Sequence, residues 1–171
     1  VIVCDFGHGL FNKEIIQLIE KKSNFLCVNV QTNSGNRGFN LFNKFKKCDL
    51  MMLDEPEVRL GLAERYMNLN DILVHKNLSA YKNLIITLGV RGMALKNKTT
   101  KKNSRVFLPA FNNKAIDTLG AGDAAYSYAS MFTKNTKNLL LIGLLSSIAA
   151  GIKASIIGHE NYIKFKDVER T

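Results

Sequence analysis

Short apolar runs that alternate with helix-like patterns constrain the fold of this chain more than any other feature. The apolar runs have the length of strands and lie at 1–6 (VIVCDF), 25–30 (FLCVNV), 49–54 (DLMMLD) and 84–89 (LIITLG). The helix-like patterns fall between them, at 13–22, 39–47, 55–66 and 70–82. This alternation predicts βαβ units and a mostly parallel sheet. Because the runs are rich in Val, Ile, Leu and Met without polar alternation, we expect both faces of the strands to be buried.

The second half of the chain predicts a hairpin and two further helices. GMALK at 92–96 and RVFLPAF at 105–111 follow the last apolar run and predict an antiparallel pair of strands. Helices are expected to begin near Ala121 and Asn138. Because no internal repeat and no linker interrupt the pattern, we interpret residues 1–171 as one compact α/β unit.

The chain carries a net charge of +10, which raises the question of nucleic acid or an anionic substrate. Its lysines are mostly scattered, and the densest basic stretch, KNKTTKKNSR at 96–105, has the composition of a turn. That stretch also lacks the aromatic side chains that a single-strand binder places between its cations. We therefore interpret it as a solvated hairpin loop and expect no nucleic-acid partner.

Cysteine usage and the apolar stretch near the C-terminus bear on where the protein works. Cys4, Cys27 and Cys48 lack metal-ligand spacing, and an odd number without a signal peptide indicates a reducing, cytoplasmic compartment. The stretch LLLIGLLSSIAAGIKASII is interrupted by Lys153, so it predicts a buried core helix rather than a membrane span. The chain opens directly on an apolar strand pattern without Met, from which we expect that further sequence lies upstream.

The stretch DTLGAGDAAY at 117–126 places glycines between two carboxylates and directly before an alanine-rich helical pattern. Small residues let backbone N–H groups approach a ligand, and the start of a helix adds unpaired donors and partial positive charge. Together these predict an anion site, most commonly for phosphate. Asp123 would repel a phosphate there unless it takes part in the chemistry; the alternative is an acidic first-turn residue that the helix dipole favours.

Several of the predicted strands end in polar residues. In open α/β sheets ligands bind at the carboxyl ends of the strands, so these residues are expected to converge. They are Asp5, Asn29, Asp54, Thr87 and the 120–123 turn.

The pattern D-T-x-G-A-G-D-A at 117–124 resembles the second signature of the ribokinase-like (PfkB) carbohydrate kinases. TLGVRG at 87–92 is similar to the nucleotide-binding turn of that family, and LDEPE at 53–57 resembles its N-x-x-E element. CDFGHG at 4–9, TNSGNRGFN at 32–40 and the C-terminal segment most resemble the heptose-7-phosphate kinase-like branch. The resemblance covers essentially the whole chain and corresponds to the C-terminal portion of a family member. It implies a ribokinase-like three-layer α/β/α fold with a mostly parallel sheet and an antiparallel hairpin.

The resemblance implies a role for each matching residue. Asp123 corresponds to the general base, and the N–H groups of Gly120, Ala121 and Gly122 to the anion hole for the transferring phosphoryl group. ATP with Mg²⁺ is the implied co-substrate. The implied nucleotide contacts are Thr87, Gly89, Gly92, Asp117, Thr118 and Ser147; the implied substrate contacts are Asp5, Gly7 and Arg37; the implied metal-linked residues are Glu57, through water, and Asp54.

Some of these positions keep a second interpretation. Asp54 and Glu57 have the spacing of a helix capping box, which is compatible with a metal role, and the family usually carries Asn in place of Asp54. Asp5 is either a turn former or a substrate residue, and Arg37 either binds a phosphate or is a solvated loop residue. Ser147 stands where relatives often place Asn near the adenine.

The sequence thus predicts an ATP- and Mg²⁺-dependent sugar kinase that transfers the γ-phosphoryl group to a sugar hydroxyl, with a phosphorylated heptose as the leading acceptor. A nucleoside kinase of the same fold, a non-catalytic nucleotide-binding module and, third, a nucleic-acid binder are the alternatives. The expected partners are ATP or ADP and a sugar or sugar phosphate, with no membrane; a homodimer is a possible assembly.

Overall fold

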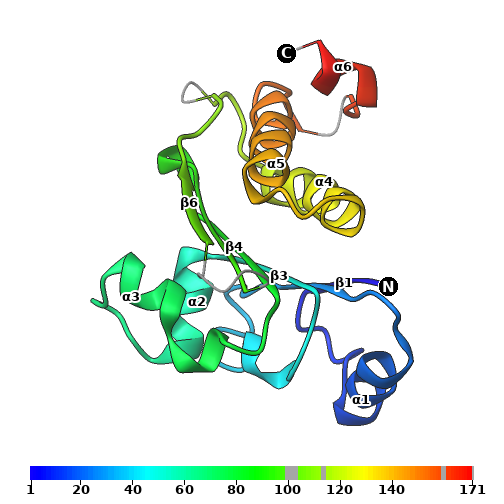
Figure 1. Cartoon of the computed structure of the whole chain (residues 1–171), viewed down its shortest axis with the longest axis vertical. Coiled ribbons are helices and arrows are strands. Elements are labelled where there is room, and N and C mark those ends of the chain that lie inside the picture. Colours follow the sequence, from blue (N-terminus) through cyan, green and yellow to red (C-terminus); the bar gives the residue numbers. More distant parts are fainter. Residues whose placement is uncertain (99–103, 113–114, 159–160, 171) are drawn as a thin grey trace. The chain divides into compact units, whose positions relative to one another are not determined.

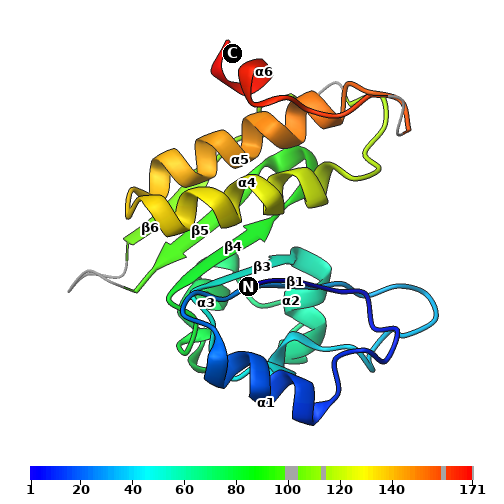
Figure 2. The ribbon, with the colours of Figure 1, turned by 90° about the vertical axis from the view of Figure 1, so that its right-hand side faces the viewer.

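The computed structural model describes residues 1–98, 104–112, 115–158 and 161–170 (Figures 1 and 2). Its strands are β1 (Ile2–Asp5), β2 (Cys27–Val30), β3 (Leu50–Asp54), β4 (Asn83–Thr87), β5 (Met93–Asn97) and β6 (Ser104–Leu108). Its helices are α1 (Lys13–Lys22), α2 (Glu55–Leu62), α3 (Leu69–Val74), α4 (Ala121–Asn135), α5 (Leu139–Lys153) and α6 (Phe165–Glu169). The strands form one sheet in the order β1-β2-β3-β4-β5-β6.

The chain divides into two compact units. Unit 1 comprises Val1–Ile86 and Leu95–Arg105, and unit 2 comprises Thr87–Ala94 and Val106–Thr171. The predicted α/β alternation is confirmed, because β1, β2 and β3 pair in parallel and helical segments connect most of the strands.

Burial on both faces is confirmed for two strands of unit 1 and wrong for a third. Every residue of β2 is buried, and β3 is buried up to its last residue, as its apolar composition predicts. In β1, by contrast, Ile2 and Cys4 are exposed while Val3 and Asp5 are buried. The physical reason is position, since β1 is the end strand of the sheet order.

The helices of unit 1 agree with the sequence in part. The predicted helix 13–22 is α1, which begins after Asn12, whose side chain accepts the Ile15 N–H at 2.9 Å. The predicted helix 55–66 ends early, at Leu62, because Ala63 takes the left-handed conformation with φ 57°. Within the predicted helix 70–82 only α3 and the 3-10 turn η2 (Lys76–Leu78) are helical.

The predicted helix 39–47 is wrong. Only a 3-10 turn, η1 (Phe42–Lys44), forms there. Asn40 is buried and donates its side-chain amide to the backbone oxygens of Asp5 and Gln31, which fixes the chain in a loop. Phe42 and Phe45 fill the core from this loop, so the apolar spacing reflects burial rather than a helix.

The two strands of the predicted hairpin, β5 and β6, are neighbours in the sheet order, and β4 and β5 are joined by backbone hydrogen bonds at both ends. Leu88 N–H donates to the Gly92 oxygen at 2.8 Å, and Lys98 N–H donates to the Lys82 oxygen at 2.9 Å. The solvated loop predicted at 96–105 is wrong at its first residue, because Lys96 is only 3% exposed within β5. Residues 99–103 of that stretch lie outside the described residues.

In unit 2, α4 and α5 pack side by side and α6 contacts α5 (Figure 2). The predicted core helix is α5, which begins after Asn138, whose side chain accepts the Leu141 N–H at 3.1 Å. One face of α5 is buried, including Ile142 and Ala149, while Leu140 and Leu144 are exposed. None of the helices in the described ranges combines the length and the apolarity that a bilayer crossing requires.

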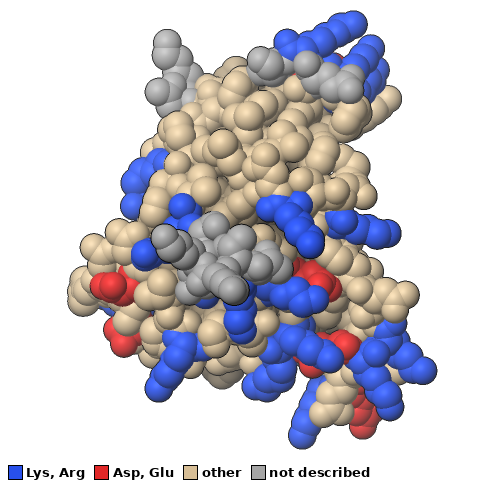
Figure 3. All heavy atoms as spheres, viewed as in Figure 1, with Lys and Arg blue, Asp and Glu red and all other residues tan. Residues whose placement is uncertain are grey.

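Surface charge follows the scattered distribution of lysines in the sequence. On the face shown in Figure 3, Lys and Arg side chains are spread over many separate places, with Asp and Glu side chains among them. Among the residues that the structure describes, the Lys and Arg side chains of this face do not line up as a single basic stripe of the kind that tracks a nucleic-acid backbone.

Candidate functional site

The backbone of the glycine turn before α4 is accessible to a ligand. Gly120 precedes the helix with φ 75°, a left-handed conformation that favours glycine. Because α4 begins at Ala121, the N–H groups of its first turn have no acceptor within the helix ladder. A Cβ placed on Gly122 would meet no described atom within 4 Å, so a ligand can approach the backbone there. The predicted helix start at Ala121 is confirmed.

Asp123 lies in the first turn of α4 and is exposed to solvent. Its backbone oxygen accepts the Ser127 hydroxyl at 2.8 Å, which helps to fix the turn that carries the carboxylate. An exposed carboxylate in a glycine-rich turn can accept a proton from a hydroxyl that approaches the same turn. Thr118, the other polar side chain predicted here, is also exposed.

Asp117 uses both carboxylate oxygens to shape the turn. Oδ1 accepts the Leu119 N–H at 2.9 Å, and Oδ2 accepts the Gly158 N–H at 2.8 Å. The N–H groups of Ile116 and Asp117 donate in addition to the Ala154 oxygen. The glycine turn is thus tied to the segment that follows α5, and Asp117 contributes to the site by positioning the backbone.

Lys153 is a member of this cluster that the sequence analysis missed as a site residue. It is the last residue of α5, it is only 8% exposed, and its Nζ donates to the Gly158 oxygen at 2.5 Å. Its Cε lies 3.4 Å from the position that a Cβ on Gly120 would occupy. The available signal was a lone lysine inside a long apolar stretch, which indicates a buried charge with a local function.

The 87–92 turn forms as its glycine spacing predicts. Gly89 is the first residue of the 3-10 turn η3 (Gly89–Arg91) and Gly92 follows it, and both glycines have positive φ. A Cβ on Gly92 would lie 2.0 Å from the Leu108 oxygen, so glycine is required for that close approach. Gly89 is exposed with open space around it, and Thr87 is half-buried at the end of β4.

Ser147 is buried within α5, and its hydroxyl contacts the backbone of unit 2. Its Oγ accepts the Phe111 N–H at 3.2 Å and donates to the Pro109 oxygen at 3.4 Å. The side chain therefore anchors the segment that follows β6. Its predicted nucleotide contact stays a prediction.

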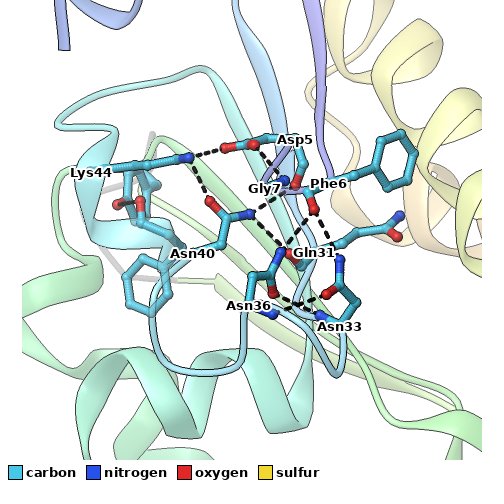
Figure 4. A network of polar contacts seen from close by, with 10 residues as sticks. Asp5, Phe6, Gly7, Gln31, Asn33, Asn36, Asn40 and Lys44 are labelled. Atoms are coloured by element: carbon cyan, nitrogen blue, oxygen red, sulfur yellow. Dashed lines mark hydrogen bonds and ion pairs between the residues drawn. The ribbon is translucent and has the colours of Figure 1, made fainter. Parts of the chain in front are cut away.

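The end of β1 in unit 1 carries a second polar cluster, shown in Figure 4. Asp5 is 2% exposed; its Oδ1 accepts the Gly7 N–H at 3.0 Å, and its Oδ2 forms an ion pair with Lys44. Lys44 Nζ also donates to Asn40 Oδ1 at 2.6 Å. Both carboxylate oxygens of Asp5 therefore hold parts of the protein in place.

Asparagine side chains in the loop after β2 form hydrogen bonds with the end of β1 (Figure 4). Asn33 and Asn36 each donate a side-chain amide to the Phe6 oxygen, at 3.1 and 2.9 Å. A Cβ on Gly7 would lie 2.1 Å from Asn36 Nδ2, so the packing requires glycine there. Arg37 is exposed in this loop. The repeated asparagines of TNSGNRGFN were the signal for this network, which sequence reasoning missed together with Lys44.

The capping box at the start of α2 is confirmed. Glu57 Oε2 accepts the Asp54 N–H at 2.7 Å, and Asp54 Oδ1 accepts the Glu55 N–H at 3.0 Å. Glu57 Oε1 also accepts the Thr32 N–H at 2.9 Å, which joins α2 to the loop after β2. Burial raises the pKa of Glu57, and the hydrogen bonds from the two N–H groups partly oppose this rise.

The predicted convergence of strand ends is seen within unit 1. The loop after β2 bonds to Phe6 after β1 and to Glu57 after β3, and Asn29 Nδ2 donates to the Met52 oxygen at 2.9 Å. In the part of the chain that the structure describes, no group of three or more His, Cys, Asp or Glu residues is placed to hold a metal ion. Thr87 and the glycine turn belong to unit 2.

The model of the pfkB family carbohydrate kinases matches residues 12–130 of this chain. No curated protein sequence gives a significant match.

Many solved structures share the fold. Ribokinase from Thermotoga maritima is 22% identical with a TM-score of 0.72, covering 92% of this chain and 52% of that protein. Ribokinase from Arabidopsis thaliana, solved with ribose and ATP, is 16% identical with a TM-score of 0.74, covering 92% and 50%. A nucleoside kinase from Burkholderia thailandensis, solved with inosine, is 16% identical with a TM-score of 0.69, covering 92% and 51%. The chain therefore has a ribokinase-like α/β fold and spans about half the length of these proteins.

Proposed function

The chain belongs to the pfkB family of carbohydrate kinases, and on this premise we propose that it takes part in the ATP-dependent phosphorylation of a sugar hydroxyl. The observation that carries the proposal is the turn before α4. Its backbone is open at Gly122, and the exposed carboxylate of Asp123 follows in the same turn. An anion site and a proton acceptor side by side are what transfer of a phosphoryl group to a hydroxyl requires.

In this proposal Asp123 accepts the proton of the attacking hydroxyl. A carboxylate can serve as the base if the proton leaves late, while the new oxygen–phosphorus bond forms, and such general base catalysis contributes about 10²–10⁴-fold. The N–H groups of Gly120 and Gly122 stabilise the charge on the transferring phosphoryl group, whereas the predicted third donor, the Ala121 N–H, donates to the Thr118 oxygen at 3.1 Å. Phosphoryl transfer depends mainly on positioning and charge stabilisation, and Asp117 supplies positioning by holding Leu119 and Gly158.

The residues present fit a nucleotide with Mg²⁺. The open turns at Gly89 and Gly122 leave backbone accessible to phosphates, and we propose that Thr87, Gly89, Gly92, Thr118 and Ser147 belong to the nucleotide side. Mg²⁺, when bound, neutralises phosphate charge, and it commonly keeps several waters. Because both oxygens of Glu57 already accept N–H groups, a contact through water is the mode that this residue fits; Asp54 is exposed beside it.

The acceptor we propose is a phosphorylated heptose, from the resemblance of the 4–9 and 32–40 segments to that branch of the family. Asp5 and Gly7 would then shape the substrate side, with exposed Arg37 as a candidate phosphate contact. The buried ion pair of Asp5 favours a positioning role for this carboxylate. The setting would be cytoplasmic, and a homodimer is compatible with the proposal.

A nucleoside acceptor is the second candidate, because one structural relative was solved with inosine. The two are separated by an assay of ADP release from MgATP by the intact protein, with heptose phosphate and inosine offered in parallel. We expect ADP release with the sugar phosphate and loss of it in Asp123→Asn. Binding of MgADP without turnover on any sugar or nucleoside would instead favour a non-catalytic nucleotide-binding module.

A further inference from the structure

Lys153 places a positive charge inside unit 2, next to the proposed phosphate site. The residue is 8% exposed, and its side chain packs against Gly120, with Cε 3.4 Å from the position of a Cβ on that glycine. Lysine is seldom buried to this degree without compensating contacts, because the ammonium group loses its water. We therefore expect local interactions of Lys153 to compensate for the lost hydration of its ammonium group.

The contacts of Lys153 lead directly to the glycine turn. Gly158 is held at both ends: its N–H donates to Asp117 Oδ2 at 2.8 Å, and its oxygen accepts Lys153 Nζ at 2.5 Å. The other oxygen of Asp117 accepts the N–H of Leu119, the residue before Gly120. Lys153, Gly158 and Asp117 thus form a chain of contacts that ends at the turn.

Stabilisation of the helix end does not by itself explain this arrangement. A lysine in the last turn of a helix interacts favourably with the helix dipole, but an exposed side chain suffices for that. Lys134 occupies the last turn of α4 in this way and is exposed. Lys153 is instead buried against the turn before α4, so its charge acts on the turn as well as on the end of α5.

We propose that Lys153 is a positioning residue whose buried charge holds the Gly120–Gly122 turn in shape and favours phosphate there. The proposal rests on the proposed function of that turn as a phosphate site. An ammonium group in a poorly solvated setting acts strongly on a nearby anion, and the effect grows with the charge of that anion. A triphosphate should therefore gain more from Lys153 than a diphosphate.

The test compares Lys153→Met with the matched control Lys134→Met in the intact protein. Calorimetry measures the affinity for MgADP and for the Mg²⁺ complex of a non-hydrolysable ATP analogue. We expect Lys153→Met to weaken the triphosphate analogue by about tenfold and MgADP by less than about threefold. Lys153→Arg and Lys134→Met should stay close to the parent. Equal losses for both nucleotides, or no loss, would show that Lys153 only stabilises the end of α5.

A second variant keeps the proposal testable if Lys153→Met does not fold. Lys153→Ala leaves room for methylammonium, which should restore triphosphate affinity, whereas tetramethylammonium at the same ionic strength should not. Weak binding without a response to methylammonium would overturn the proposal. A parent protein that binds neither nucleotide would overturn the proposed function, whereas normal binding by Lys153→Ala would overturn only the inference about Lys153.

Discussion

Asp5 in unit 1 and Asp123 in unit 2 are both carboxylates near glycines with positive φ, yet the structure places them in opposite settings. Asp5 is buried, and its oxygens hold Lys44 and the Gly7 N–H. Asp123 is exposed in the first turn of a long helix. The oxygens of a buried carboxylate that contacts an ammonium group and an N–H group are already occupied, whereas an exposed carboxylate remains accessible to a substrate.

The difference shows why a short pattern of Asp and Gly does not specify a function. In both places the glycines allow a tight turn, and the local sequence alone would permit either setting. The deciding partners of Asp5, such as Lys44 and Asn40, come from the loop after β2, far along the chain. In unit 2 the corresponding task of fixing the turn falls to Asp117, which leaves Asp123 exposed.

The largest expected effect is on catalysis by Asp123. In the intact protein, Asp123→Asn should lower kcat by about 10²–10⁴-fold, because the amide cannot accept the hydroxyl proton. Nucleotide affinity and thermal stability should stay near those of the parent, since the side chain is exposed. Steady-state kinetics with calorimetry of MgADP binding measures both. A variant with near-normal turnover would return Asp123 to the role of a helix-start residue.

Removal of the cation beside Asp5 tests whether this buried carboxylate depends on its ion pair for stability. Lys44→Met should lower the free energy of unfolding by about 2 kcal/mol, because it leaves a buried carboxylate without its ion-pair partner. Lys82→Met is the matched control: its ion pair with Asp49 involves a side chain that is 63% exposed, against 27% for Lys44. The control should cost less than about 1 kcal/mol. Urea unfolding measures the free energy of unfolding of both variants. Equal decreases in the two variants would mean that Asp5 is not stabilised by its cation.

Glycine substitutions extend the comparison to the backbone. Gly7→Ala places a Cβ 2.1 Å from Asn36 Nδ2 at φ 75°, and we expect it to cost about 2 kcal/mol of stability. Gly122→Ala meets open space in a helix, so stability should stay equal or rise by up to about 1 kcal/mol. The added methyl group should nevertheless weaken MgATP binding, because it covers the backbone that phosphate approaches. Thermal unfolding and calorimetry on both variants check this; unchanged MgATP affinity in Gly122→Ala would place the phosphate elsewhere.

The sequence predicted the parts of the structure that depend on local pattern. The strands β2 and β3, helix α1, the start of α4 and the capping box of α2 follow from apolar runs, a helix-like pattern, a glycine turn and a D-x-x-E spacing. The helix predicted at 39–47 failed because Asn40 bonds to backbone that is distant in sequence. Lys153 and the asparagine network were missed for the same reason, since their function depends on which segments the fold brings together.

The burial of Glu57 is intermediate between that of Asp5 and that of Asp123. Its substitution has the smallest expected effect on stability. Glu57 is half-buried and accepts two N–H groups, while burial raises its pKa above the ordinary value of 4.5. A folded-state pKa above the unfolded one favours the protonated form, so this stabilisation is present at acid pH and is lost as pH rises through the folded pKa. Glu57→Gln does not titrate, and its carbonyl oxygen can still accept the Asp54 N–H. The free energy of unfolding of the variant, minus that of the parent, should therefore increase as pH rises from 4.5, by less than the effect of Lys44→Met.

Urea unfolding at several pH values measures this difference, and a Mg²⁺ titration of kcat in the same variant tests the metal role. A flat pH difference with an unchanged Mg²⁺ requirement would reduce Glu57 to a hydrogen-bond acceptor that joins α2 to the loop after β2.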